Sequence, residues 1–436
     1  MVLLIIFSLT ILIVILLILV EMPVGFAFGF GALFYGFTSG IDVSYHATYG
    51  MAQVGSFSLL ALPLFVMAGT LMGICGISER LLNFIDAFVG RTKGGLGVVT
   101  VIACALFGAI SGSAAAAIAA IGKIMAPRMI KNGYDPGYVT GLIAVSSVLA
   151  FLIPPSIPMI VFAIATRQSV AECFLSTMFP GILLTMLYCF LNIFFLRHDM
   201  NIKVAPKKGN KEIWREIVFT GKRAVWAIVM PVLILGGIYS GICSPTEAGA
   251  VGVVYTLIVG KFVFKALSVK DVFDATLDAA TIVGSVIVIL FFLFVMSRGM
   301  VLASIPGQFA DLLLGLSDNR IVILLIVNLL LFIMGMVIDD ISGGVLAAII
   351  LMPVMQKIGV HPLHFAAIVG TNLGLGNITP PCAPLLYMAG GVTRLSLHQY
   401  VWHATKFLLF GHIPMVFLVT FVPQISLFLP LWYAGR

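Results

Sequence analysis

The sequence is poor in charge: only 9% of its 436 residues are Asp, Glu, Lys or Arg, whereas 61% are hydrophobic and the mean hydropathy is +1.17. Soluble domains carry roughly 25% charged residues, so a soluble fold is excluded. Apolar stretches of about 17 to 25 residues, the length that crosses a ~30 Å hydrocarbon layer as a helix, recur from Val2 to the C-terminus. Because backbone groups in lipid must bond within their own segment, this pattern predicts an all-α polytopic protein in a lipid bilayer.

Cysteine is also scarce. The six cysteines are scattered through apolar segments, with no CxxC pair and no histidine at the spacing of a metal ligand. This excludes a disulfide framework and a zinc site. The basic residues, which give the chain a net charge of +7, do not interleave with aromatic residues, so a nucleic acid is excluded as partner. No organic cofactor is expected.

Ten apolar stretches are long enough to cross a bilayer as helices. They are residues 2–20, 22–38, 54–75, 137–165, 172–197, 224–241, 244–266, 280–300, 363–391 and 400–430. Two further stretches, 95–127 and 321–356, carry small or polar residues at their centres, Ser111-Gly112-Ser113 in the first and Asp339 to Ser342 in the second. Such a centre is typical of a re-entrant hairpin with a buried tip. The sequence therefore predicts five crossings and one hairpin in each half.

An odd number of crossings inserts the second half upside down relative to the first, and the basic residues test this orientation. With the N-terminus outside, 19 of the 24 Lys and Arg residues fall on the cytoplasmic side. The other side keeps Arg167, Arg298, Arg320, Lys357 and Arg436. Because Lys and Arg concentrate in cytoplasmic loops, this bias predicts two inverted repeats with both chain termini outside.

Two pairs of similar segments support the division into repeats. Leu64-Phe65-Val66-Met67 recurs as Leu293-Phe294-Val295-Met296, and Ile153-Pro154-Pro155 corresponds to Thr379-Pro380-Pro381 at an offset of 226 residues. We therefore divide the chain into a first repeat, 1–197, a basic cytoplasmic linker, 198–223, and a second repeat, 224–436.

A Pro-Pro pair interrupts one spanning stretch in each repeat, 137–165 in the first and 363–391 in the second. Proline lacks the backbone donor of a helical hydrogen bond, so each stretch is predicted to be two half-helices joined by unwound chain. We expect the second half-helices to begin at Pro154-Pro155 and at Pro380-Pro381, with Thr379 as a cap. One proline in a membrane helix is usually only a kink, but two equivalent breaks favour a binding site.

The hairpin tips supply caps for two more helix starts, Ser111 and Ser113 in the first and Asp340 or Ser342 in the second. Four positive helix ends are thus expected to converge, which suits a carboxylate, while the unwound carbonyls around Ile153 and in 374–378 suit a sodium ion. Simple packing of the small residues is the structural alternative. The histidines fall mostly near the ends of predicted segments, which favours sodium over protons as the coupling ion.

Asp339 and Asp340 lie deepest within a predicted apolar stretch, and intramembrane acids are functional by default unless they lie in a solvated loop. They raise the alternative of an intramembrane aspartyl protease. Neighbouring aspartates on a helix point about 100° apart, and no second embedded acid with a Tyr-Asp pattern lies at a helix centre, so the protease is disfavoured. Arg298 could reach a substrate carboxylate, although snorkelling to the interface is the commoner role of such an arginine.

Five motifs in this order and spacing resemble those of a known family. They are GAISGSAAAA (108–117), LIPPSIPMI (152–160), SPTEAGA (244–250), MGMVIDDISGG (334–344) and GLGNITPPCAP (374–384). Together they resemble the large membrane subunit of tripartite ATP-independent periplasmic (TRAP) transporters, within the ion transporter superfamily. The resemblance covers essentially the whole chain.

The resemblance implies a function. Such subunits are elevator-type transporters of the bacterial inner membrane, in which the hairpins and broken helices move as a block against a scaffold of the remaining helices. They import small organic acids, commonly C4-dicarboxylates or sialic acid, down a sodium gradient. They work with a periplasmic substrate-binding protein and a small four-helix membrane subunit, expected here as a separate chain. The alternative is a stand-alone sodium-coupled carboxylate or anion carrier of the same superfamily.

The resemblance also implies sites, position by position. One sodium site would use Ser111, Gly112 and Ser113 with Ile153 and Pro154. The second would use Asp339, Asp340, Gly376, Asn377 and Thr379. The small anionic solute would lie between them, with Ser113, Pro155, Ser156, Asp340, Ser342, Pro380 and the more distant Arg298 as candidate contacts.

Overall fold

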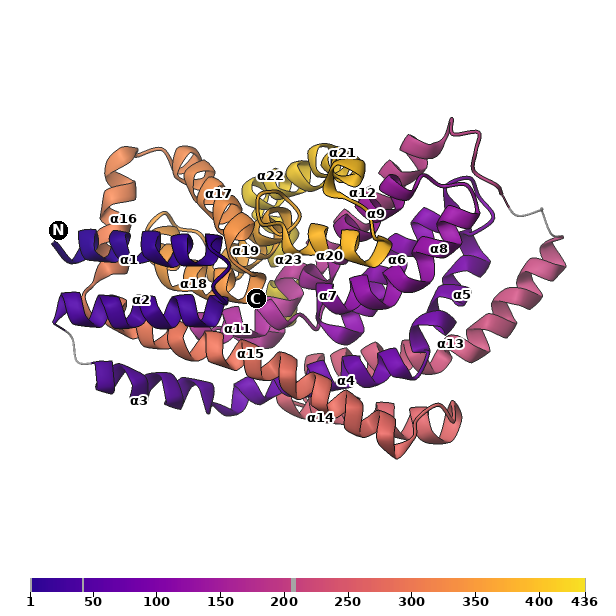
Figure 1. Ribbon diagram of the computed structural model, residues 1–436, viewed down its shortest axis with the longest axis horizontal. Coiled ribbons are helices and arrows are strands. Elements are labelled where there is room, and N and C mark those ends of the chain that lie inside the picture. Colours follow the sequence, from indigo (N-terminus) through magenta and orange to yellow (C-terminus); the bar gives the residue numbers. More distant parts are fainter. Residues whose placement is uncertain (1, 41–42, 205–208, 436) are drawn as a thin grey trace.

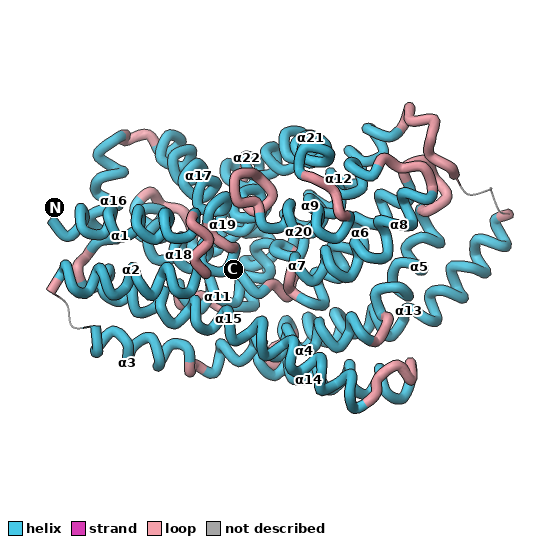
Figure 2. The backbone as a smooth tube through the Cα atoms, viewed as in Figure 1, coloured by secondary structure: helices cyan, strands magenta, loops and turns pink. Residues whose placement is uncertain are grey.

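The computed structural model describes residues 2–40, 43–204 and 209–435, and in these ranges every regular element is helical (Figure 2). Nine helical stretches in the described ranges are long and apolar enough to cross a membrane. The all-α polytopic fold predicted from the sequence is thereby confirmed. Residues 205–208 of the predicted linker, Met1 of the first repeat and the terminal Arg436 lie outside the described residues.

The first half contains two long N-terminal helices, a hairpin and a broken helix. Its elements are α1 (Val2–Leu19), α2 (Val24–Ser39), α3 (Val43–Val54), η1 (Phe57–Leu60), α4 (Ala61–Ile74), α5 (Ile77–Val89), α6 (Gly95–Ser111), α7 (Ala114–Ala117), η2 (Ile118–Gly122), α8 (Lys123–Lys131), α9 (Pro136–Ser147), α10 (Leu149–Leu152), α11 (Ile157–Thr166) and α12 (Val170–Leu196). The hairpin is α6 with α7 to α8, and the broken helix is α9 to α11.

The second half has corresponding elements. They are α13 (Asn210–Tyr239), α14 (Pro245–Ile258), η3 (Val259–Val263), α15 (Val269–Leu302), α16 (Ile305–Leu316), α17 (Arg320–Val337), α18 (Asp340–Lys357), α19 (Pro362–Gly376), α20 (Pro384–Thr393), α21 (Leu397–Phe407), η4 (Leu408–His412), α22 (Ile413–Phe421) and α23 (Pro423–Tyr433). Here α17 and α18 form the hairpin, and α19 and α20 form the broken helix.

The packing between the halves is reciprocal. α2 packs against α15 while α14 packs against α4, and α1 packs against α16 while α13 packs against α5. Each element of these pairs has its sequence counterpart on the other side of the contact. Each half therefore completes the packing of the other, as two copies of one unit would.

The elements form two groups. The long helices α3, α4, α14 and α15 lie along the lower edge of the molecule in Figure 1, and the hairpins and broken helices lie above them. Within the upper group, α9 packs on the hairpin arm α6 and α19 packs on α17. Leu142, Val148, Phe365 and Val369 of the broken helices are fully buried there. The broken helices are thus the core of the upper group.

Several helices differ from the predicted spans because polar residues continue them. α13 begins at Asn210, within the predicted linker 198–223, and α15 begins at Val269, well before residue 280. At Ser268 a capping box with Asp271 starts α15, so acids that read as a loop in an apolar scan are its first turn. The helix α3, which is only weakly apolar, was not predicted.

The predicted C-terminal span 400–430 is also divided. Its helix ends at Phe421, and α23 begins at Pro423 after Val422, whose backbone is not helical (φ −119°, ψ 82°). A residue before proline avoids the α conformation, and the proline lacks the N–H that would continue the helix. The apolar run therefore contains two helices.

Candidate functional site

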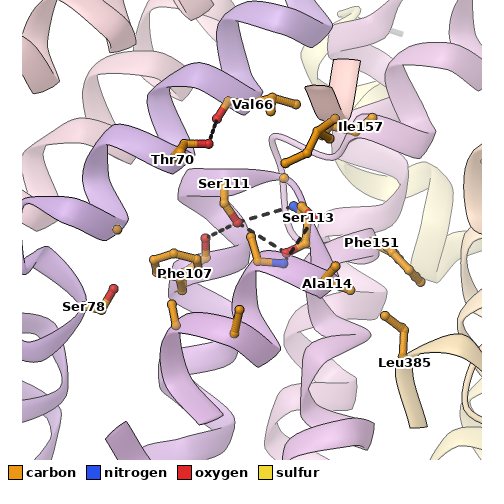
Figure 3. Close-up of a pocket in the computed structure, with 18 of the residues that line it drawn as sticks. Val66, Thr70, Ser78, Phe107, Ser111, Ser113, Ala114, Phe151, Ile157 and Leu385 are labelled. Atoms are coloured by element: carbon orange, nitrogen blue, oxygen red, sulfur yellow. Dashed lines mark hydrogen bonds between the residues drawn. The ribbon is translucent and has the colours of Figure 1, made fainter. Parts of the chain in front are cut away.

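The tip of the first hairpin is formed by Ser111, Gly112 and Ser113. Gly112 ends α6 in the left-handed conformation (φ 63°), which glycine adopts without steric cost. Ser113 is the N-cap of the returning helix, where its Oγ accepts a hydrogen bond from the Ala116 N–H at 3.3 Å. The Ser111 hydroxyl donates to the Phe107 carbonyl oxygen at 3.0 Å (Figure 3). Local bonds therefore hold both serine hydroxyls at the tip.

This tip contacts the unwound chain of the first broken helix. α10 ends at Leu152 and α11 begins at Ile157, so residues 153–156 are outside any helix. The Ile157 N–H donates to the Gly112 carbonyl oxygen at 3.3 Å, and a Cβ at Gly112 would lie 2.9 Å from the Pro155 carbonyl oxygen. Tip and break form what we call the first half-site, made of hydroxyl and carbonyl oxygens.

The tip of the second hairpin carries two aspartates. Asp339 is the N-cap of α18, and its Oδ2 accepts hydrogen bonds from the N–H groups of Ile341 and Ser342, each at 3.1 Å. Asp340 is the first helical residue. A carboxylate is favoured at the positive end of a helix. Ser113 and Asp339 are 226 residues apart, the offset of the Pro-Pro pairs, and both are cap residues.

The second break is longer than the first. α19 ends at Gly376 and α20 begins at Pro384, so residues 377–383 are unwound. Asn377 is buried, and its side-chain amide donates to a carbonyl oxygen one turn earlier in α19 at 2.9 Å. A Cβ at Gly376 would lie 2.4 Å from the backbone of Gly335 in α17, so only glycine fits this crossing. The second tip and break, joined by this contact, form the second half-site.

A cavity of about 520 Å³, which we call the central cavity, lies where these parts meet. The starts of four helical segments line it: Ser113 before α7, Ile157 of α11, Asp340 of α18 and Leu385 of α20. Thr70 of α4 is on the opposite wall (Figure 3). Helix N-termini present N–H groups and partial positive charge, so the cavity suits an anionic group, while the oxygens of the half-sites suit a monovalent cation.

Both second half-helices begin later than predicted. α11 starts at Ile157 rather than at Pro154-Pro155, and α20 starts at Pro384 rather than at Pro380-Pro381. The first proline of each pair precedes another proline and is therefore kept out of the α conformation. The next prolines along the chain, Pro158 and Pro384, take the first helical positions instead.

The other predicted residues are not in the lining of the central cavity. Thr379 is not a cap, since its hydroxyl donates to the Leu375 carbonyl oxygen at 2.8 Å. The predicted residues placed in the breaks or at the second tip, outside the cavity wall, are Ile153, Pro154, Pro155, Ser156, Asp339, Ser342, Gly376, Asn377, Thr379 and Pro380. Arg298 lines a different cavity, together with Arg167.

Buried oxygens at both half-sites test whether a cation fits there. Ser156 Oγ in the first, and Asp339 Oδ1 and Ser342 Oγ in the second, are buried without a hydrogen-bond partner among the described residues. Buried polar atoms are normally satisfied. Hydroxyl and carboxylate oxygens are ligands of hard cations, so the donor sets fit a cation in each half-site.

Sequence reasoning missed two charged residues of the central cavity. Lys123, at the start of α8, and Glu79, in α5, line it and are exposed. Lys123 had been counted only among the cytoplasmic charges. Its position inside the predicted hairpin 95–127 was the signal that it lies close to the tip.

His412 corrects the expectation that histidines lie mostly near segment ends. It is fully buried, with Nδ1 2.9 Å from the Tyr188 hydroxyl and Nε2 2.9 Å from the Thr371 carbonyl oxygen. A neutral imidazole satisfies both contacts, accepting at one nitrogen and donating at the other. Because Thr371 is in α19 shortly before the second break, His412 supports that helix.

Two hairpins and two broken helices around one cavity define the class: the protein is a polytopic membrane transporter. Solved transporters share the fold. The YdaH transporter of Alcanivorax borkumensis is similar with a TM-score of 0.61 and 16% identity, covering 89% of this chain and 90% of that one. MtrF of Neisseria gonorrhoeae is similar with a TM-score of 0.60 and 14% identity, covering 86% and 83%.

The particular family follows from the sequence comparison. The family model "Tripartite ATP-independent periplasmic transporter, DctM component" matches residues 11–425, and the chain belongs to this family. The family resemblance found in the motifs is thereby confirmed, and the chain is a transport protein rather than an enzyme.

Curated relatives are similar over nearly all of this chain. The C4-dicarboxylate large permease DctM of Vibrio cholerae is 31% identical over 93% of this chain and 94% of its own length. The sialic acid large permease SiaM of the same organism is 32% identical, with 95% and 96% covered. The isethionate permease DctMQ of Oleidesulfovibrio alaskensis is 33% identical over 95% of this chain, which spans only 64% of that relative.

Proposed function

We propose that this chain is the large membrane subunit of a sodium-coupled importer for a small organic acid. The observation that carries the proposal is the meeting of four helix starts, at Ser113, Ile157, Asp340 and Leu385, in one cavity beside two oxygen-lined half-sites. The N-termini bind the acid group, and the half-sites bind sodium. Binding both ligands next to each other couples the gradient of one to the movement of the other.

The substrate class follows from chemistry shared among relatives. Those relatives are named for C4-dicarboxylates, for sialic acid and for isethionate, which are all small organic acids. Helix N-termini recognise the acid group that these molecules share, whereas the walls of the cavity select the rest of the molecule. We assign a carboxylate or sulfonate of this size to the central cavity.

Sodium binds at the half-sites in this proposal. The first uses oxygens of Ser111, Gly112 and Ser113 with those of the chain at Ile153 and Pro154. The second uses Asp339 and Asp340 with Gly376, Asn377 and Thr379. Unwound carbonyls and carboxylates are common sodium ligands in transporters with broken helices. Support comes from the unpartnered oxygens of Ser156, Asp339 and Ser342.

The two groups of helices suggest how transport proceeds. The hairpins and broken helices move as a block against the layer of long helices, which is an elevator mechanism. The chain lies in the bacterial inner membrane as two inverted repeats, with both termini periplasmic and the basic residues cytoplasmic. A cysteine introduced at Lys261 should then react with a membrane-impermeant thiol reagent only from the cytoplasmic side. Reaction from outside overturns the topology, and the native cysteines, none of them exposed, make the unsubstituted chain a suitable control.

Two partners complete the proposed transporter, a small four-helix membrane subunit and a periplasmic substrate-binding protein. The length of the relative DctMQ that this chain does not span supports the first. The experiment is uptake of labelled succinate, N-acetylneuraminate or isethionate into proteoliposomes that hold the chain and its small subunit. We expect uptake to require both an inward sodium gradient and the purified binding protein.

Each of the other outcomes has a defined meaning. Uptake by this chain without either partner supports the alternative, a stand-alone sodium-coupled carboxylate or anion carrier. Uptake that a sodium gradient does not change removes sodium as the coupling ion. Absence of uptake for all three acids, from proteoliposomes in which the complex is folded and inserted, contradicts the proposed substrate class.

A further inference from the structure

Three helices line two separate cavities at different points along their length. α11, α15 and α18 contribute Ile157, Val286 and Ile341 to the central cavity, and they contribute Arg167, Arg298 and Ile349 to a second cavity of about 220 Å³. At about 1.5 Å per helical residue, Ile341 and Ile349 are about 12 Å apart along α18. The second cavity is therefore about two helical turns beyond the central one, between the layer and the upper group.

Two arginines give the second cavity its character. Arg167 ends α11, and the Arg298 guanidinium lies 5.0 Å from the centre of the Tyr49 ring, which holds it in place. Gln53 and Ser297 are also in the lining, and no acidic residue is present among the described lining residues. Two guanidinium groups without a carboxylate, next to neutral donors, form a site suited to a carboxylate or sulfonate.

A packed apolar layer separates the two cavities. Val161 of α11, Leu290 and Leu293 of α15, and Val345 and Leu346 of α18 all lie between the two lining segments of their helices, and all are buried in one cluster. No ligand passes such a layer while α11 and α18 keep their place against α15. A ligand in the two-arginine cavity waits until that contact opens.

The opposite end of the central cavity leads elsewhere. It shares Ile74, Gly76 and Glu79 with a charged cavity of about 870 Å³ that includes Arg80 and Lys222. Under the proposed topology this charged cavity is at the cytoplasmic end. The two-arginine cavity is then at the end from which the solute arrives, and it holds two of the few cations on that side.

We infer that Arg167 and Arg298 form an entry-side site for the acid group of the solute, separate from the central cavity. The inference rests on the proposed function, because it identifies the ligand as the organic acid that the protein carries. A small anion fits better than a segment of a partner protein, since the cavity is only about 220 Å³ and is walled by helices from both groups. Arg167 belongs to the proposed moving block and Arg298 to the layer, so the site comes apart when they slide.

The test is ligand-observed NMR on the purified full-length chain with its small subunit, using succinate, N-acetylneuraminate and isethionate as probes. We expect two classes of binding, one that requires sodium and one that does not. The double variant R167Q/R298Q should weaken the sodium-independent class about tenfold or more, the scale of losing a hydrogen bond to a charged group. R320Q, at an exposed arginine outside both cavities, is the matched control and should change neither class.

A transport measurement supplies the second readout. For R298Q we expect the KM for external acid to rise about tenfold with kcat nearly unchanged, and efflux from the inside to keep its own KM. R298K should retain part of the affinity, because the charge remains while the planar donor geometry is lost.

The failures are distinguishable. A sodium-independent class that depends on the arginines, with no sodium-dependent class, removes the proposed coupling and leaves the anion site. A wild-type protein with only sodium-dependent binding overturns the entry-side site, as does a sodium-independent class that R167Q/R298Q leaves unchanged. A folded double variant that loses sodium-dependent binding as well places the arginines in the central site and also overturns the inference.

Discussion

The first and second half-sites share one backbone plan and differ in charge. Each joins a hairpin tip to an unwound segment, and the equivalent cap residues are Ser113 and Asp339. The first half-site has only neutral oxygens, whereas the second carries the carboxylates of Asp339 and Asp340. The backbone thus sets the geometry in both halves, and the side chains set how strongly each half attracts a cation. Substitutions should therefore affect the second half-site more than the first.

The surroundings of the two breaks differ in the same direction. Asn328 of the second hairpin accepts hydrogen bonds from Asn372 of α19 at 2.8 Å and from Thr420 of α22 at 2.9 Å. The position equivalent to Asn372 in the first half is Ser146, a buried hydroxyl without a partner among the described residues. A polar network therefore braces the charged half-site, while apolar packing and backbone contacts hold the neutral one.

The largest expected effect is that of Asp339→Asn. The amide oxygen can still accept the two N–H bonds of the cap, so the helix start is kept while the charge is lost. We expect sodium-driven uptake to fall about 100-fold, on the scale of removing one partner of a buried charge, about 3 kcal/mol. Asp318→Asn, at an exposed position before α17, is the control and should be silent. Near-normal uptake by Asp339→Asn would remove the charge from the account of the second half-site.

Next in size is Gly376→Ala, which tests the backbone part of the plan. The added Cβ would lie 2.4 Å from the backbone of Gly335, so the hairpin and α19 must separate. We expect a loss of about 1–3 kcal/mol in stability, measured as a lower Tm of the purified protein in detergent. Gly391→Ala, where the Cβ meets no atom within 4 Å, is the matched control. Equal Tm values for both variants contradict the proposed close contact.

A smaller effect is expected at the first half-site, from Ser113→Ala. The substitution removes the hydroxyl that caps the returning helix and supplies a neutral oxygen, at a cost of about 1 kcal/mol. The sodium concentration for half-maximal uptake should rise about fivefold, and Ser113→Thr should restore most of the loss. An effect as large as that of Asp339→Asn would show that charge does not distinguish the two half-sites.

The smallest effect compares the breaks directly. Thr379→Val removes a hydroxyl that donates to the Leu375 carbonyl oxygen, and we expect a roughly twofold change in half-maximal sodium, since a neutral hydrogen bond contributes about 1 kcal/mol or less. The equivalent position in the first half is Ile153, which has no side-chain oxygen, so Ile153→Val should leave sodium dependence unchanged. A sodium effect at Ile153 would show that side-chain packing, rather than oxygen ligands, controls the breaks.

Sequence periodicity and proline chemistry were enough to predict the helical class and the presence of tips and breaks. Hydrophobic stretches report burial in lipid, and Pro-Pro pairs interrupt helices wherever they occur. Helix boundaries were less accessible. Pro158 and Pro384, not the Pro-Pro pairs, take the first helical positions, because that choice depends on which residue can adopt the α conformation.

The parts that could not be predicted depend on contacts between distant segments. Lys123 is close to the hairpin tip in sequence, but its place in the central cavity depends on how α8 packs. Arg298 and Arg167 are 131 residues apart and share a cavity only because α11 and α15 lie side by side there. His412 is buried because α12 and α19 cover it. None of these relations has a local sequence signal.

The central claim is that both half-sites bind sodium that drives acid uptake through the central cavity. The most direct test is the dependence of initial uptake rate on external sodium for the wild type, Ser113→Ala and Asp339→Asn. The account predicts a sigmoidal dependence for the wild type, a curve shifted to higher sodium for Ser113→Ala and nearly no sodium response for Asp339→Asn. Uptake with the same sodium dependence in all three proteins would contradict it.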